Sequence, residues 1–335
     1  MCNRYALLFV GAVIGAGFAS GREVFSFFTQ YGHWSWPLIL ITASVMTLLC
    51  FLCHRGIGEA DEYSLCRDIV GHRSGRCLSG ISILLLDAVM GGAMISAAGH
   101  IAALAVPYRG AYLLGVAVTI GLAFLLGRAD TKPMMVLSAL LAAIHVTAVV
   151  AVMLFDRGEI TYALPTDMPL AAVLGGGVGS VAYAALNMTL ALGVIGRCTG
   201  LSCRAWCRTA AIFGLWMTGL LFFSNFLYLK HPELNEAAFP MVVLLSRFGR
   251  VGYVASLFVM YLAILTTLSA VLLALRNGME QYFPPKAAVL SAAALTLLLS
   301  VTGFEELVQR WYTPAGILCL CLVFLPMLKN HRKIS

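Results

Sequence analysis

The chain has 335 residues, of which 61% are hydrophobic and only 11% are charged. Soluble domains carry about 25% charged and about 45–50% apolar residues, so the composition excludes a soluble enzyme, a disordered chain and a nucleic-acid-binding module. It predicts an all-α, polytopic membrane protein. The net charge of +7 therefore bears on orientation in the membrane and not on nucleic acid.

Apolar stretches follow one another along the chain with short connections between them. A hydrocarbon core of about 30 Å needs about 20 apolar residues per helix. The first stretch runs into Ser20, Arg22 and Glu23 with no polar domain after it, so we expect a membrane span and not a cleaved signal peptide. We expect residues 1–335 to form a single transmembrane domain. The ten expected spans are residues 5–30, 35–53, 78–105, 110–127, 133–155, 168–196, 206–229, 249–275, 286–303 and 312–328.

The basic residues indicate how these spans are oriented. If the N-terminus is inside, the inner segments carry 15 Lys and Arg residues and the outer segments carry 7. Basic residues gather on the cytoplasmic side of membrane proteins. We therefore expect an even number of spans, both termini in the cytoplasm, and a location in the plasma (inner) membrane with the lipid bilayer around the chain.

Two glycine-rich clusters lie half a chain apart, at residues 11–23 in the first span and 174–183 in the sixth. Each falls in the first span of a five-span half. Because five is odd, the second half begins on the opposite side of the membrane. We therefore expect inverted repeats over residues 5–155 and 168–303, with the final helix 312–328 completing the second, and breaks in spans one and six.

Glycine-interrupted helices at matching positions of two halves point to the midplane site of a transporter. Unwound backbone is tolerated at that depth only where it lines a cavity or is buried in protein. Its freed carbonyl and N–H groups can bind ions and carboxylates. For either cluster alone the alternative is close helix packing, because small residues recur there every four positions. The candidate substrate-binding residues are Gly15, Ala16, Gly17, Ser20, Gly21, Glu23, Gly177, Gly179, Ser180, Tyr183 and Asn187.

The run Gly-Ala-Gly-Phe-Ala-Ser-Gly-Arg-Glu at 15–23, followed by Phe-Phe-Thr-Gln-Tyr-Gly at 27–32, resembles the opening of the YkvI-type bacterial membrane proteins. These are regarded as distant members of the amino acid–polyamine–organocation transporter superfamily. The resemblance covers the whole chain in length and span count. It implies a LeuT-like fold with a 5+5 inverted repeat, and transport of a small amino acid or a related amine or zwitterion.

Span eight carries a second, independent resemblance. Its Ala-Ile-Leu-Thr-Thr stretch at 263–267 is similar to the Ala-x-x-Thr-Ser stretch in span eight of sodium symporters with the LeuT fold. The alternative is that both threonines bond only to their own helix. The second sodium site of that family uses an asparagine where this chain has Phe18, so we expect one ion at most. The sodium ligands implied by the resemblance are Gly11, Ile14, Ala263, Thr266 and Thr267.

Four ionisable residues are candidates for coupling, gating or substrate contact. Asp87 lies in span three. A charged carboxylate inside a membrane costs free energy, so such a residue is a functional candidate by default. The alternative is that Asp87 lies at the inner end of the span and pairs with a loop arginine. His145 in span five is a proton site or a buried neutral histidine. Arg22 and Glu23 stand at the outer end of the first break, as a gate, a substrate contact or a single ion pair. The segment 230–248 is expected to form a lid or a plain connector.

These features favour an ion-coupled secondary transporter that works by alternating access. Sodium or a proton would drive it, no other cofactor is expected, and the sequence has no Gly-x4-Gly-Lys-Ser/Thr loop for ATP. The alternative is a receptor-like membrane protein, as proposed for germinant-receptor subunits of this superfamily, that binds a small molecule without net transport. An enzyme is not expected, because Asp87, His145 and Glu23 fall on different spans. The substrate, the coupling ion, the direction of transport and the oligomeric state stay open.

Overall fold

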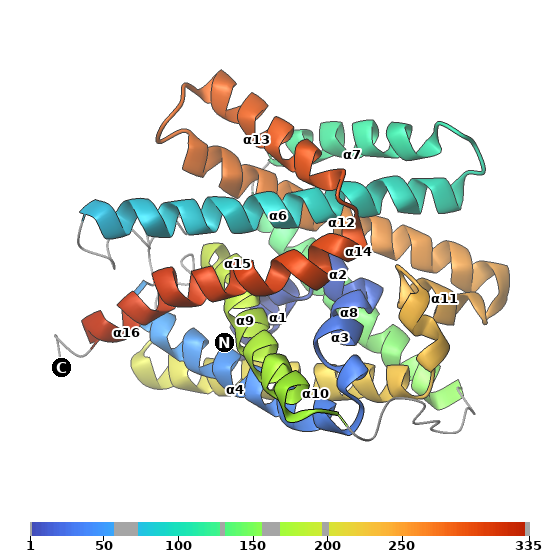
Figure 1. Ribbon diagram of the computed structural model, residues 1–335, viewed down its shortest axis with the longest axis horizontal. Coiled ribbons are helices and arrows are strands. Elements are labelled where there is room, and N and C mark those ends of the chain that lie inside the picture. Colours follow the sequence, from blue (N-terminus) through green and yellow to red (C-terminus); the bar gives the residue numbers. More distant parts are fainter. Residues whose placement is uncertain (1, 57–72, 128–130, 156–167, 196–200, 332–335) are drawn as a thin grey trace.

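The computed structural model describes residues 2–56, 73–127, 131–155, 168–195 and 201–331, and in these ranges the chain is helical without strands (Figure 1). Six helical stretches in the described chain are long and apolar enough to cross a membrane, and three shorter helices are similarly apolar. The first expected span adds a helix in three pieces. Each of the ten predicted spans therefore overlaps observed helix, and the all-α prediction is confirmed.

The first span is interrupted twice, as the glycine cluster predicts. It consists of α1 (Cys2–Val13), α2 (Ala16–Ser20) and α3 (Arg22–Phe27). The first interruption is extended at Gly15, and the second is Gly21 with a φ of 85°. A left-handed backbone costs an ordinary residue about 1–2 kcal/mol, so glycine suits position 21.

The remaining helices follow the predicted order. A short turn, η1 (Thr29–Trp34), joins the first span to the second. The last span is continuous from residue 304 but contains two π-helical turns, which are frequent at functional sites. The other elements are α4 (Ser35–Leu52), η2 (Cys53–Gly56), α6 (Arg73–Ala105), α7 (Ala111–Gly127), α8 (Thr131–Phe155), α9 (Leu170–Ile195), α10 (Cys203–Leu229), η3 (Pro232–Glu236), α11 (Pro240–Ser246), α12 (Gly249–Met279), α13 (Pro285–Ser300), α14 (Phe304–Glu306), η4 (Leu307–Trp311), α15 (Tyr312–Cys319), η5 (Leu320–Phe324) and α16 (Leu325–His331).

The predicted break in the sixth span is wrong, because α9 is one continuous helix through its glycine cluster. Each glycine costs a helix only about 1 kcal/mol, whereas unbonded backbone in a bilayer costs several, so the helix keeps its hydrogen bonds. The glycines serve packing in part. A Cβ on Gly176 would come within 2.9 Å of Tyr31 and 3.0 Å of Leu38, while one on Gly175 or Gly177 would meet nothing within 4 Å.

The helices form two groups that contact each other across the centre of the molecule. The first span, α4, α9 and α10 pack together in one group, and α6, α7, α12 and α13 pack together in the other (Figure 1). Helix α15 touches both α9 and α6, and α8 touches both α1 and α12. Each group takes consecutive spans from both predicted halves, which is the arrangement an inverted repeat would give; the repeat boundaries themselves stay a prediction.

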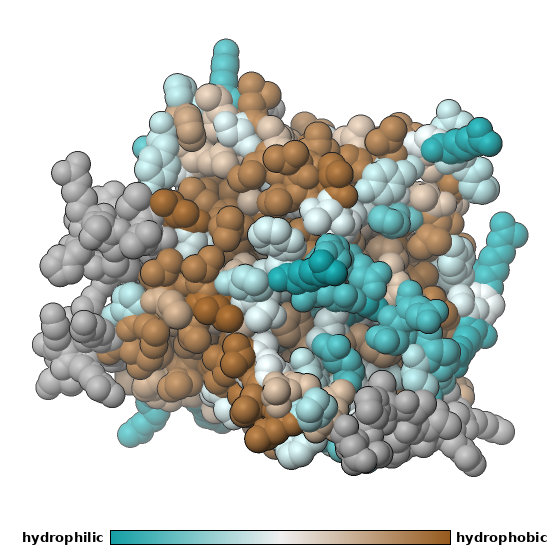
Figure 2. Space-filling model, viewed as in Figure 1, coloured by the Kyte–Doolittle hydropathy of each residue, from teal (hydrophilic) through white to brown (hydrophobic). Residues whose placement is uncertain are grey.

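Much of the visible surface is apolar (Figure 2). Figure 2 shows hydrophobic residues over much of one face, with hydrophilic ones gathered where Figure 1 places α3, α11 and α14. Large apolar side chains stand exposed in both helix groups, as a bilayer-spanning protein requires. Those more than two-thirds exposed include Leu113, Leu154, Leu170, Leu215, Val251, Leu290, Leu298 and Val301.

Candidate functional site

The first interruption of span one frees two backbone carbonyls. The N–H of Gly15 donates to the Val13 carbonyl at 2.8 Å and not to that of Gly11, and Ala19 donates to Gly15 at 3.0 Å. Within the described chain, no backbone N–H donates to the carbonyls of Gly11 or Ile14. These are the two carbonyls that the sequence resemblance names as cation ligands.

The second interruption turns the chain so that Glu23 folds back over α2. A Cβ on Gly17 would overlap the Glu23 carboxylate, so only glycine leaves room for it. The Tyr183 hydroxyl of α9 donates to Glu23 Oε2 at 2.8 Å. The Tyr183 ring packs on Phe27 and Phe28, with ring centroids 4.6 Å and 5.6 Å away. Two residues predicted from separate glycine clusters, 160 positions apart, therefore meet directly.

Ser20 makes two hydrogen bonds within the interrupted segment. Its Oγ donates to the Gly17 carbonyl at 2.6 Å and accepts from the Arg22 N–H at 3.0 Å. Ala16 and Ser20 are fully buried. Gly21 lies against Tyr228 of α10, whose hydroxyl would overlap a Cβ built there. The segment from Gly15 to Glu23 is thus a compact, buried, irregular stretch whose shape depends on its small residues.

The other candidates on α9 lie at different positions around the helix. Asn187 is buried and donates to the carbonyl of Tyr183 at 3.0 Å, so it supports the residue that reaches Glu23. Ser180 is buried, its Oγ has no described partner, and its carbonyl accepts from Thr42 of α4 at 3.2 Å. A Cβ built on Gly179 would lie 3.8 Å from the Phe27 ring, whereas one on Gly177 would meet nothing within 4 Å. The structure therefore does not bring Gly177 to the site.

One of the predicted sodium ligands of α12, Thr267, faces the first interruption. Helix α12 packs on α2, and Thr267 Oγ1 lies 3.4 Å from the position of a Cβ on Gly15. The Thr266 hydroxyl lies 3.0 Å from the carbonyls of both Leu262 and Ala263 in its own helix. A hydroxyl that donates to its helix keeps acceptor lone pairs, so this bond is compatible with binding a cation. The donor set is all oxygen and neutral, which suits a hard cation.

The ionisable candidates of spans three and five are both buried. His145 of α8 packs edge-on against Phe18 of α2, with ring centroids 5.4 Å apart, and its Nε2 has no described partner. It therefore lies beside the first interruption, next to the residue that replaces the family's asparagine. Asp87 is 1% exposed within α6. The contacts described for the interruption do not include it.

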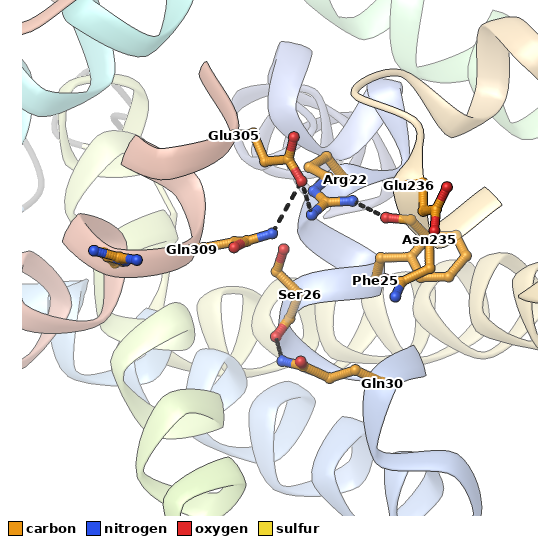
Figure 3. Close-up of a pocket in the computed structure, with 9 residues that line it drawn as sticks. Arg22, Phe25, Ser26, Gln30, Asn235, Glu236, Glu305 and Gln309 are labelled. Carbon is orange, nitrogen blue, oxygen red and sulfur yellow. Dashed lines mark hydrogen bonds and ion pairs between the residues drawn. The ribbon is translucent and has the colours of Figure 1, made fainter. Parts of the chain in front are cut away.

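Arg22 joins three segments of the chain (Figure 3). Its guanidinium donates to Glu305 of α14 and to the Asn235 carbonyl of η3, and lies 3.5 Å from the Ala237 carbonyl. Arg22 is 3% exposed. The alternative of a single Arg22–Glu23 ion pair does not hold: the two side chains leave α3 on different sides, because neighbouring helical residues do not face one another.

A polar cavity of about 470 Å³ lies beside this arginine. Gln309 donates to Glu305 at 3.2 Å, and Gln30 donates to the Ser26 carbonyl on the opposite wall (Figure 3). The segment 230–248, expected to form a lid or a plain connector, contributes η3 and α11 and touches the first span.

Four residues of this region were not predicted from sequence: Tyr228, Tyr312, Asn235 and Glu305. Both tyrosines are fully buried with hydroxyls that have no described partner. Tyrosines in spans seven and ten give no local signal, because aromatic residues are common in membrane helices. A signal was available for Glu305, since it belongs to an acidic pair at the start of the last span.

Comparison with known proteins supports the fold and the resemblance. No family model matches the chain. The chain is 23% identical over 336 residues to the uncharacterized membrane protein YkvI of Bacillus subtilis (strain 168), covering 96% of this chain and 94% of that one. This confirms the resemblance seen in span one.

Solved transporter structures superpose over nearly the whole chain. Mhp1, a nucleobase-cation-symport-1 family transporter in a closed conformation with bromovinylhydantoin bound, matches with a TM-score of 0.68 at 13% identity, covering 99% of this chain and 78% of that one. The chain has a LeuT-like fold. The manganese transporter of Eremococcus coleocola matches with a TM-score of 0.62 at 13% identity, covering 97% of this chain and 77% of that one.

Proposed function

We propose that this chain is an ion-coupled secondary transporter of a small amino acid or a related amine or zwitterion. The observation that carries the proposal is the twice-interrupted first span, with two freed carbonyls and a buried carboxylate at its centre. Irregular backbone at membrane depth is tolerated only around a site or inside protein. The similar structures of Mhp1 and the manganese transporter support transport and not enzymatic catalysis.

Alternating access would come from movement of one helix group against the other. The first span, α4, α9 and α10 pack as one group and α6, α7, α12 and α13 as the second. In such folds one bundle rocks around a fixed central site. The interrupted first span belongs to one group, and Thr267 of α12, which faces it, belongs to the other, so a bound cation would link the two.

Sodium is the coupling ion that this geometry favours. The freed carbonyls of Gly11 and Ile14 would share it with the Ala263 carbonyl and the hydroxyls of Thr266 and Thr267. Thr267 already lies beside Gly15, which places α12 within reach of the interruption. The partnerless Nε2 of His145 supports a proton as the other candidate.

Arg22 would act as the gate on the outer side. Its bonds to Glu305 and to the η3 carbonyls fasten the first span, the last span and the segment 230–248 to one another. Breaking them would free that segment to uncover the centre. This assignment of sides follows the charge asymmetry, from which we expect both termini in the cytoplasm. The plasma (inner) membrane stays the expected location.

The test is the thermal stability of the purified protein in sodium chloride against choline chloride at equal ionic strength. An ion that binds only the folded state raises stability by RT ln(1+[L]/Kd). We expect a sodium-specific rise in the melting temperature that Thr266→Ala/Thr267→Ala abolishes. A rise that the double variant keeps would refute the α12 site, and equal stability in both salts would favour proton coupling.

Flux separates the transporter from a receptor-like protein. Proteoliposomes with an imposed sodium or proton gradient would be tested with a panel of labelled amino acids and amines. Gradient-dependent accumulation of any of them supports transport. Saturable binding with no accumulation under either gradient would replace the proposal with a small-molecule receptor.

A further inference from the structure

The Glu23 carboxylate is buried without a cationic partner. It is 3% exposed, it lies against Gly17, and its described hydrogen bond comes from the neutral Tyr183 hydroxyl. The guanidinium of the adjacent Arg22 bonds instead to Glu305 and to the Asn235 carbonyl of η3. In the part of the chain that the structure describes, no Lys, Arg or His forms an ion pair with Glu23. A buried carboxylate is expensive unless a cation accompanies it.

Two further tyrosine hydroxyls at this place lack partners. Tyr228 of α10 sets its hydroxyl against Gly21, and Tyr312 of α15 is near enough to Glu23 to interact with it electrostatically. Both hydroxyls are fully buried, and neither has a hydrogen-bond partner among the described residues. Buried polar groups in proteins are almost always hydrogen-bonded. These tyrosines come from three helices: Tyr183 bonds to Glu23, and Tyr228 contacts Gly21, two residues before Glu23. The set that they form with Glu23 and Tyr312 lacks a cation with several N–H donors.

We propose that the Glu23 carboxylate and the hydroxyls of Tyr183, Tyr228 and Tyr312 bind the protonated amine of the transported solute. This inference rests on the proposed function and narrows its substrate class. An ammonium group brings one positive charge and several N–H donors, which is what the cluster lacks. A solute carboxylate would instead meet Glu23 as a like charge.

The substrate is therefore a protonated amine, and its carboxyl group is dispensable. Tyr228 lies directly on Gly21, between Gly17 and Glu23, and Tyr183 bonds to Glu23 itself. The amine would enter when the Arg22 contacts open. A solute that carries a carboxylate and no amine would not be held at this position.

The experiment measures binding of matched solutes to the full-length purified protein by thermal shift and isothermal calorimetry. Each set contains an amino acid, its decarboxylated amine and its deaminated acid: valine, isobutylamine and isovalerate, and phenylalanine, phenethylamine and 3-phenylpropionate. We expect the amine and the amino acid of at least one set to bind and the acid not to bind. Glu23→Gln should weaken that binding at least tenfold.

Two variants separate recognition from folding. Glu306→Gln is the matched control, because Glu306 pairs with Arg310 at 2.9 Å on the rim and should leave affinity unchanged. Tyr228→Phe removes a hydroxyl that has no described partner, so it should weaken amine binding severalfold while the melting temperature without solute stays the same. If Tyr228→Phe lowers both the amine affinity and the melting temperature without solute, Tyr228 has a structural role and is removed from the site.

The proposal is overturned if an acid binds better than its amine, if Glu23→Gln binds the amine as tightly as wild type, or if no amine-bearing member of any set binds. These outcomes differ from failure of transport itself. Gradient-driven uptake of a carboxylic acid alone would keep the transporter and reject the amine site. Amine binding that depends on Glu23 without flux would keep the site and reject transport.

Discussion

The hydrogen bond from Tyr183 to Glu23 gives a measurable prediction about stability. Tyr183→Phe deletes one oxygen atom and keeps the ring, so the contacts with Phe27 at 4.6 Å and Phe28 at 5.6 Å remain. The lost bond is 2.8 Å long, between a fully buried hydroxyl and a carboxylate that is 3% exposed. Water cannot replace it easily there, so Glu23 Oε2 is left unsatisfied.

Leaving a buried acceptor unsatisfied costs about 1–3 kcal/mol, and we expect Tyr183→Phe to lose that much. The measurement is thermal unfolding of the purified protein in one detergent, without solute. Tyr228→Phe is the internal control, because it deletes an equally buried hydroxyl that has no described partner. We expect its midpoint to match wild type. Equal losses in the two variants would refute the reasoning, since they would show that the hydroxyl bond to Glu23 contributes nothing specific.

Three further predictions follow from single contacts. Gly21→Ala should destabilise the protein by at least about 1–2 kcal/mol, because φ is 85° and the new Cβ would overlap the Tyr228 hydroxyl. Gly177→Ala is the control in the same unfolding assay, because its Cβ would meet nothing within 4 Å in a regular helix. It should leave the free energy of unfolding unchanged or raise it by up to about 1 kcal/mol. Glu305→Gln should increase hydrogen–deuterium exchange over residues 232–246 by weakening the hold on Arg22, and Glu306→Gln should not; equal exchange in both would remove Arg22 as a latch. At Glu233, burial raises the carboxyl pKa, but bonds from its own backbone, Arg247 and His231 lower it more, so it lies below the ordinary 4.5. Its stabilising effect is therefore present above pH 4.5 and is lost as the pH falls through the lower pKa of the folded state, and the difference in melting temperature between wild type and Glu233→Gln should vanish on that acid side.

Hydropathy alone located the spans. A segment that crosses the bilayer must form its backbone hydrogen bonds within itself and present apolar side chains to the lipid, so each span is a long apolar helix. The same logic predicted the interruption of the first span. There, glycines at 17 and 21 coincide with Ser20, Arg22 and Glu23, which a plain packing helix does not need. It failed for the sixth span, where the glycines of α9 adjoin Ser180 but no charged residue, and the helix runs through them.

The site itself needed the tertiary structure. Nothing local to residues 228, 305 or 312 shows that helices α10, α14 and α15 meet at the first span. That convergence depends on how the spans pack, and packing in a membrane is decided by close shape complementarity between helices and not by apolar character, which all of them share. The sequence by itself determined that the chain crosses the membrane as helices and where the first of them breaks. Only the packed structure decided that Glu23 turns inward to Tyr183 of α9, while Arg22, one residue earlier, bonds to Glu305 and to the segment 230–248.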